Sequence, residues 1–205
     1  MKYNVPSMIA LALVTSFSAY AATPPDTLVI AQSIDDASSL DPAQGFELTS
    51  VQAFTNLYQR LVQSDPKNPI DIQPTLASNW QPGADNRSMT FTLRDGAKFA
   101  GGNPVRPEDV IFSLSRVVKL NLEPSFILTQ LGWTPENVDA SLKKVGPNQV
   151  QVSWSANVSP TYVLSLLSAP VASIVDEKTV MANQKKNDYG NQWLITHSAG
   201  SGPYQ

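Results

Sequence analysis

The sequence predicts an α+β fold, a mixed α/β class in which helices stand between β-hairpins. Residues 88–93 alternate apolar and polar side chains, which is typical of a strand with one buried face. Residues 138–145 and 150–154 flank turn formers at 146–149, which predicts a hairpin. Pro107 opens a stretch of helical apolar spacing between these strands, so the elements do not alternate regularly.

Composition limits the class of protein before any element is placed. The 205 residues carry 14 Lys and Arg against 17 Asp and Glu, with one histidine and no cysteine. The lack of cysteine excludes a disulfide framework and a thiolate metal site. A formal net charge of −3 without a basic cluster lacks the cations that neutralise phosphates, so nucleic acid is not an expected partner.

Residues 1–21 have the pattern of a secretory signal peptide. Lys2 precedes an apolar run at residues 8–14, and residues 19–21 form a small-x-small cleavage pattern. The run is shorter than the roughly 20 residues that span a bilayer, which argues against the alternative of a membrane anchor. No cysteine follows it, so lipid attachment is not expected. We expect cleavage before Ala22 and a soluble protein in the bacterial periplasm.

The first elements of the mature chain are expected to be a strand and a helix. Residues 28–31 form a short, β-branched apolar run, which predicts a buried strand. From Ser50 onward apolar residues recur with helical spacing, and Thr49 or Ser50 would cap this helix through its hydroxyl. Residues 65–69, rich in proline, aspartate and asparagine, are expected to break it.

The next predictions concern a hairpin and a helix start. Asp95 and Gly96 follow the strand at 88–93 and predict the turn of a hairpin whose buried face carries Met89, Phe91 and Leu93. Pro107 suits a first helical position, and the two acids after it suit the positive end of the helix dipole. A short helix near 162–167 and a strand near 171–175 complete the expected order.

No catalytic constellation is found in the sequence. His197 is the only histidine, whereas a triad or a zinc site needs it beside a nucleophile or further ligands. The acid pairs at 35–36 and 108–109 are interpreted as a turn and a helix start, with acid/base work as the alternative. Gly200-Ser201-Gly202 is interpreted as a flexible turn. We expect no catalytic residue, no metal and no cofactor. Four tryptophans are assigned to the core, although they would also be able to stack a ligand: Trp80, Trp133, Trp154 and Trp193.

Several segments occur in an order that is characteristic of one family. They cover most of the mature chain, and the ordered set is specific although each piece alone is weak. The segments are 27–31, 40–43, 56–62, 73–80, 89–99, 104–113 and 200–204. Together they resemble the bacterial extracellular solute-binding proteins of family 5.

The resemblance implies a fold of the periplasmic binding protein type II kind, in which two lobes close over a solute. It places a first segment of lobe I at 22–57, an inserted peripheral domain at 58–188, and the start of the return into lobe I at 189–205. Proteins of this kind run to about 500 residues in three lobes of ordinary domain size. The second lobe is therefore expected to be absent from this 205-residue chain, which would make it a fragment.

Two positions depart from the family pattern. Gly101-Gly102-Asn103-Pro104 stands where members commonly carry Asp-Gly-Thr-Pro, and Arg106 stands where they carry a small polar helix cap. Both lie in the expected peripheral domain. They therefore bear on local stability more than on ligand binding.

The resemblance also implies a function and a set of ligand-facing residues. It implies a receptor that hands peptides, or in some members nickel complexes, to an inner-membrane ABC permease, and we expect it to act as a monomer. A secreted hydrolase and a permease-docking structural module without solute binding are the alternatives. Because a cleft needs two walls, this chain alone is expected to bind solute weakly or not at all. The residues expected to line the cleft, with an exposed surface loop as the alternative, are Gln44, Gly45, Phe46, Glu47, Leu48 and Thr49.

Overall fold

The computed structural model describes residues 24, 27, 29, 31 and 33–204. The chain divides into two units, Met1–Ser33 and Ile34–Gln205, and the elements reported below belong to the second. The expected signal peptide lies outside the described residues, as do Leu28 and Ile30 of the expected first strand. The described residues of that stretch, Val29 and Ala31, belong to no strand.

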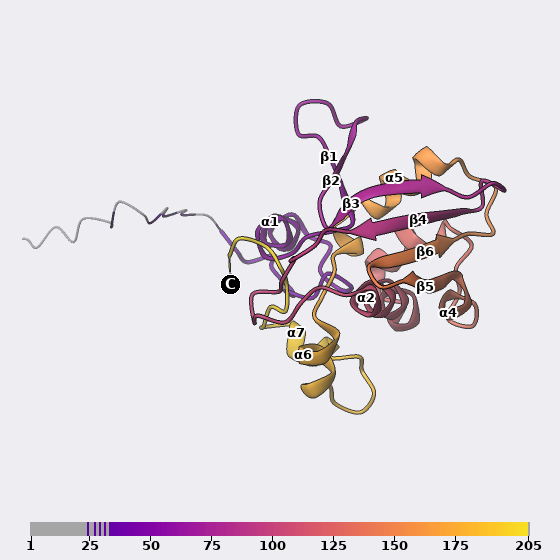
Figure 1. Ribbon diagram of the computed structural model, residues 1–205. Helices are drawn as coiled ribbons and strands as arrows, with labels where there is room; N and C mark the ends of the chain where they lie inside the picture. Colours follow the sequence, from indigo (N-terminus) through magenta and orange to yellow (C-terminus); the bar gives the residue numbers. More distant parts are fainter. Residues whose placement is uncertain (1–23, 25–26, 28, 30, 32, 205) are drawn as a thin grey trace, which may run out of the picture. The chain divides into compact units, whose positions relative to one another are not determined.

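Helices and strands follow one another in an irregular α+β order, as the sequence predicts (Figure 1). The order is α1 Leu48–Leu57, β1 Val62–Ser64, β2 Ile72–Pro74, β3 Ala77–Pro82, β4 Ser88–Leu93, α2 Pro107–Leu120, η1 Glu123–Ser125, α3 Phe126–Thr129, α4 Val138–Ser141, β5 Leu142–Gly146, β6 Gln149–Ser153, α5 Pro160–Leu167, η2 Pro170–Ala172, α6 Glu177–Ala182 and α7 Asn191–Leu194.

A four-stranded antiparallel sheet in the order β3-β4-β6-β5 forms the centre of this unit, and β1 and β2 make a separate two-stranded ribbon. Phe91 in β4 lies opposite Trp80 in β3 and Val150 in β6. Alternate residues of β4 are buried, which confirms the predicted apolar face. Figure 1 shows α2, α4 and α5 next to this sheet, α6 and α7 farther from it, and the ribbon β1–β2 projecting away from it.

The hairpin that contains β4 differs from the prediction. Its partner is the preceding strand β3, joined through residues 83–87, and Gly83 N–H donates to the Ser88 carbonyl across the turn (2.8 Å). Gly96 instead takes a positive φ of 72° and begins a loop. Strand β3 was not visible in the sequence because an edge strand needs no alternating apolar pattern and tolerates the proline at its end.

The second hairpin, β5–β6, is confirmed, but its first strand begins later than predicted. Residues Val138–Ser141 form the helical turn α4. The side chain of Asn137 holds this turn, because it accepts the Thr134 N–H (2.8 Å) and donates to the Gly132 carbonyl (3.0 Å). A local side-chain contact therefore overrides the strand-like apolar pattern at this point.

Helix α2 begins at Pro107 as predicted, with Arg106 as its N-cap residue. Its buried face lies against the sheet and carries Val110, Leu114 and Val118, each fully inaccessible. The helix ends at Asn121, whose φ of 49° is left-handed, a conformation that asparagine tolerates. Helix α5 likewise matches the helix expected near 162–167.

Helix α1 begins and ends earlier than predicted. Its N-cap residue is Glu47, not Thr49 or Ser50, and no side chain caps it. Thr49 instead donates its hydroxyl to Asp36 (2.6 Å). The helix stops at Leu57, so the turn formers at 65–69 connect β1 to β2 rather than break a helix.

The strand expected near 171–175 is not formed. Pro170 begins the short 3-10 helix η2. Residues 171–175 are all buried, but they pair with no strand. Ile174 N–H donates to the Gln59 carbonyl (2.9 Å), and Val175 N–H donates to the Ser113 hydroxyl (2.9 Å). An apolar run that is buried on all sides looks the same in sequence whether or not it pairs with a strand.

Two clusters of buried side chains hold the unit together. The larger lies between the sheet and α2, α3 and α5, and includes Trp133 and Trp154. The smaller joins α1, α6, α7 and the segment that follows them, through Phe54, Val180 and Leu194. None of the helices in the described stretch is both long and apolar enough to cross a bilayer.

Candidate functional site

The segment expected to face solute follows a tight turn that Asp41 organises. The carbonyl of Asp41 accepts the N–H groups of Gln44 (2.9 Å) and Gly45 (2.8 Å), and its carboxylate accepts the N–H of Ala43 (2.9 Å). The Ser39 hydroxyl in turn accepts the Asp41 N–H (3.0 Å). Aspartate commonly initiates turns in this way, by bonding the backbone two residues on.

A buried ion pair anchors this turn to helix α2. Arg116 donates from both terminal nitrogens to the two carboxylate oxygens of Asp41, at 2.7 and 2.8 Å. The side chains are 2% and 0% exposed. The Nε N–H of Arg116 donates to the Tyr189 carbonyl (3.1 Å). A bidentate pair of a guanidinium and a carboxylate fixes the relative orientation of the two side chains as well as their distance. The turn, α2 and the backbone at Tyr189 therefore meet in one rigid junction.

The turn is also tied to the far end of α1. The Tyr58 hydroxyl donates to the Leu40 carbonyl (2.9 Å). Burial raises the pKa of the Tyr58 hydroxyl, which therefore remains a protonated donor. Gly45 is needed beside it, since a Cβ there would lie 2.6 Å from the ring of Phe54 and 2.8 Å from the Ser39 carbonyl.

Of the six predicted site residues, two lie toward the interior, two are exposed, and Glu47 and Thr49 are partly exposed. Gly45 is buried and Gln44 is partly buried, facing Asn191. Phe46 and Leu48 are exposed, at 42% and 70%. Phe46 meets Phe126 edge to face, with ring centroids 5.6 Å apart. The segment therefore offers apolar surface on its outer side, and its role in binding a solute stays a prediction.

Glu47 supplies negative charge at the N-terminal end of α1. Its carboxylate accepts a hydrogen bond from the Ser38 hydroxyl (2.5 Å) and another from the Phe46 N–H (3.1 Å). The hydrogen bond from Ser38 lowers the pKa of the Glu47 carboxyl, with smaller backbone contributions in the same direction. An ionised carboxylate is also favoured at the positive end of a helix dipole.

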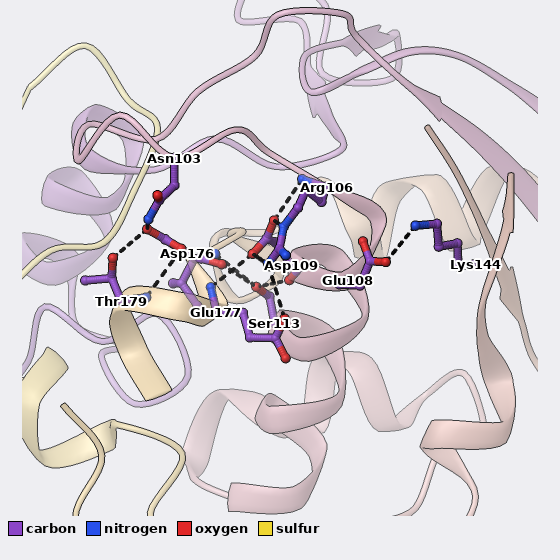
Figure 2. Close-up of polar contacts among 10 residues, drawn as sticks. Asn103, Arg106, Glu108, Asp109, Ser113, Lys144, Asp176, Glu177 and Thr179 are labelled. Carbon is purple, nitrogen blue, oxygen red and sulfur yellow. Dashed lines mark hydrogen bonds and ion pairs between the residues drawn. The ribbon is translucent and has the colours of Figure 1, made fainter. Parts of the chain in front are cut away.

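A second polar cluster surrounds the start of α2 and includes both positions that depart from the family pattern (Figure 2). Arg106 N–H donates to Asp109 (2.8 Å), and the Arg106 guanidinium pairs with the same carboxylate (3.1 Å). The hydrogen bond to Asp109 raises the pKa of Arg106. Asn103 donates to the buried carboxylate of Asp176 (2.7 Å), which also accepts the Thr179 hydroxyl. The unusual residues therefore donate to the carboxylates of Asp109 and Asp176, which stand at the starts of α2 and α6.

This second cluster has the character of a structural junction. Asp109 is fully buried and also accepts the Glu177 N–H (3.1 Å). Figure 2 shows Glu108 turned away from it toward Lys144, and these two side chains form an exposed ion pair (2.7 Å). A cavity of about 150 Å³ is lined by Asn103, Arg106 and Asp176, which are engaged in these bonds, and by Pro104 and Lys178. The interpretation of the 108–109 pair as a helix start is thus confirmed.

The Gly-Ser-Gly segment near the end of the chain is not a free turn. Gly202 N–H donates to the Leu57 carbonyl (3.0 Å), and Tyr204 N–H donates to the Asn56 carbonyl (3.3 Å). A Cβ on Gly200 would lie only 1.9 Å from the Leu57 oxygen. These glycines therefore allow the backbone to lie directly against the end of α1, where Figure 1 shows the C-terminal segment, in yellow, passing the helix.

His197 packs against an aromatic ring. Its imidazole stacks on the indole of Trp193, with centroids 4.7 Å apart and an interplanar angle of 13°. Across the residues that the structure describes, no group of three or more His, Cys, Asp or Glu side chains is placed to hold a metal ion.

Sequence reasoning did not single out the junction of Asp41, Arg116 and Asn191. A signal was present for Arg116, which stands among apolar residues on the buried side of a predicted helix. Asp41 stood in a cluster of turn formers and in a family segment. Neither residue indicates its partner, because the two lie 75 positions apart.

Comparison with known proteins places the chain in a family. Residues 71–205 match the model of the bacterial extracellular solute-binding proteins, family 5 Middle. The chain belongs to this family. Family 5 proteins bind solutes and are not enzymes, which agrees with the lack of catalytic machinery expected from the sequence.

Individual relatives extend the match beyond the middle region. The chain is 33% identical over 203 residues, 97% of its length, to the probable D,D-dipeptide-binding periplasmic protein DdpA of Escherichia coli K12. It is 38% identical over 126 residues, 58% of its length, to the periplasmic murein peptide-binding protein MppA of the same organism. It spans 37% and 23% of these two relatives, so it corresponds to about a third or less of such a protein.

Solved structures show the same partial match. The unliganded open form of the murein tripeptide-binding protein MppA superimposes with a TM-score of 0.64 at 27% identity, over 77% of this chain and 32% of that one. The Burkholderia pseudomallei OppA structure gives a TM-score of 0.65 at 21% identity, over 82% and 33%. The fold is therefore a mixed α/β portion of a family 5 periplasmic binding protein.

Proposed function

We propose that this chain is part of a periplasmic receptor that captures peptides and delivers them to an inner-membrane ABC permease. The observation that carries the proposal is the match to DdpA along almost the whole chain, since that relative is named for binding D,D-dipeptides. The murein peptide-binding relative supports the same substrate class. Such a receptor works by a shift between open and closed lobes, and the closed form docks on the permease.

Within this proposal, residues Gln44–Thr49 form part of one wall of the cleft. Phe46 and Leu48 present apolar surface to side chains of the peptide, and Glu47 presents negative charge to a cationic group. The peptide main chain would be held by backbone groups, which gives affinity with little side-chain selectivity. One wall buries only part of a peptide, so this chain by itself binds weakly.

A chemical-shift titration tests the proposal. We expect tri-alanine or D-Ala-D-Ala to shift the amide resonances of residues 44–49 with a Kd on the order of 1 mM, about −4 kcal/mol. Phe46→Ala should weaken this binding about threefold to tenfold, because apolar contact area is lost. Val145→Ala removes a similarly exposed apolar side chain on β5 and should leave it unchanged. Shifts confined to other residues would contradict the assignment, and micromolar affinity would show that one wall suffices.

Export to the periplasm is a separate part of the proposal. The relatives are periplasmic proteins, and residues 1–21 have the pattern of a cleavable signal. Mass spectrometry of the protein from a periplasmic extract should find Ala22 as the first residue, without a lipid. Recovery of the intact Met1 end in an envelope fraction would contradict this.

A further inference from the structure

We propose that Asn191 is a positioning residue for the solute-facing segment, and this inference rests on the proposed function for the role of that segment. The side-chain amide of Asn191 donates to Asp41 Oδ2 (2.8 Å) and to Gln44 Oε1 (2.9 Å). A primary amide has two N–H donors, so both are used. Asn191 therefore bridges the buried ion pair and the first residue of the segment.

The Asp41 end of this bridge is rigid. One carboxylate oxygen accepts Arg116 Nη1 and the Ala43 N–H, and the other accepts Arg116 Nη2 and Asn191. The group is fully buried, and every one of these bonds would be costly to lose away from water. The carboxylate cannot turn without breaking several bonds at once, which makes it a fixed point of reference.

The Asn191 end is held equally well. Asn191 N–H donates to the Asp188 carbonyl (3.0 Å), and Gly190, with a left-handed φ of 73°, donates its N–H to the Asp188 carboxylate (3.0 Å). The carbonyl of Tyr189 accepts Arg116 Nε (3.1 Å). The loop before α7 is thus bound to the same arginine that binds Asp41.

Gln44 connects this junction to the outward residues. Its N–H donates to the Asp41 carbonyl, and its side chain accepts a hydrogen bond from Asn191. The backbone and the side chain of Gln44 are therefore both held by the same junction. Phe46 and Leu48, two and four positions later, are exposed, and Phe46 also meets Phe126 edge to face. Asn191 lies 147 positions from Gln44 in the chain, so docking of the return segment contributes to the orientation of the segment proposed to meet solute.

Hydrogen exchange on the 205-residue chain tests this step directly. Asn191→Ala should speed exchange of the Gly45 and Phe46 amides about threefold to tenfold, the range for loss of about one ordinary hydrogen bond. The matched control is Asn103→Ala, which also removes an amide that donates to a buried aspartate, Asp176 (2.7 Å). It should leave the Gly45 and Phe46 amides unchanged. Equal acceleration in both variants, or none in Asn191→Ala, would overturn the proposal.

Gln44→Ala supplies a second test that does not depend on the fold tolerating Asn191→Ala. It removes only the Gln44 end of the bridge and should also speed exchange at Gly45 and Phe46. If Asn191 acts through Gln44, the double variant should exchange no faster than Asn191→Ala alone. Additive acceleration would overturn this route.

Titration with tri-alanine separates this proposal from the proposed function. Asn191→Ala should weaken tri-alanine binding about threefold to tenfold, whereas Asn103→Ala should not. Equal binding by the unchanged chain and by Asn191→Ala would overturn the positioning role. If the unchanged chain does not bind tri-alanine at all, the proposed millimolar binding by this one wall fails, and the exchange result alone decides whether Asn191 positions the segment.

Discussion

Arg116 and Asp41 show how a single pair of side chains joins distant parts of the chain. Both are nearly inaccessible to water, and each satisfies the other with two hydrogen bonds. Removing both charges of such a pair can be neutral, but removing one leaves an uncompensated charge in the core. The pair therefore matters to stability chiefly because neither charge is left buried without its partner.

Asp41→Ala should destabilise the protein by about 3–5 kcal/mol, because Arg116 would be left buried and unpaired. Asp139→Ala is the matched control. It breaks the ion pair with Lys119, which lies on α2 like Arg116. The Asp139 side chain is 62% exposed, and exposed ion pairs contribute about 0–1 kcal/mol. Urea unfolding of both variants measures the difference. Similar losses for the two would show that burial does not set the cost.

Gly200→Ala should be destabilising by about 1–3 kcal/mol, because its Cβ would meet a backbone oxygen 1.9 Å away that cannot move aside cheaply. Gly101→Ala is the control, since a Cβ at Gly101 meets nothing within 4 Å, and its stability should stay within about 0.5 kcal/mol. Thermal unfolding of the two variants gives the comparison. An unchanged melting temperature for Gly200→Ala would contradict the close contact with Leu57.

At the scale of elements, local signals predict starts of helices better than pairing of strands. Pro107 and the acids after it mark the start of α2 because capping is decided within one turn. Strand β3 has no such signal, because its stability comes from β4 beside it. Arg106 adds a case between the two, since its side chain cannot accept a hydrogen bond and the Asp109 carboxylate instead accepts the Arg106 N–H while pairing with its guanidinium.

Asp109→Ala should cost about 2–4 kcal/mol, because it would leave the N–H groups of Arg106 and Glu177 without their acceptor at a buried site. The neighbouring change Glu108→Ala removes an exposed carboxylate paired only with Lys144 and should cost less than about 1 kcal/mol. Denaturant unfolding of the two variants separates a capping role from a general effect of negative charge. A larger loss for Glu108→Ala would exclude the capping account.

At the scale of the whole unit, the smaller core crosses the domain boundaries expected from the sequence. Val180 lies inside residues 58–188, whereas Phe54 and Leu194, which it packs with, lie outside them. The larger core lies almost entirely within 58–188. A domain cut at these boundaries would keep its sheet, but α6 would lose the side chains that it packs against.

Residues 58–188 expressed alone should therefore fold cooperatively but with a loosened α6. Hydrogen exchange should find β4 and β6 protected as in the 205-residue chain, and α6 exchanging much faster, because its contacts with Phe54 and Leu194 are gone. Circular dichroism during heating checks that a cooperative transition remains. Protection of α6 equal to that in the longer chain would show that the smaller core is dispensable.

The sequence by itself determined the α+β class, the buried face of β4, the hairpin β5–β6 and the start of α2, because period, turn residues and caps act over a few positions. It also carried the family, through short segments in a fixed order. Only the tertiary structure decided that 171–175 is a buried connection, that Gly200 lies against α1, and that Asp41, Arg116 and Asn191 meet. These outcomes depend on contacts between residues far apart in the chain, and no local pattern specifies which partner a buried side chain will find.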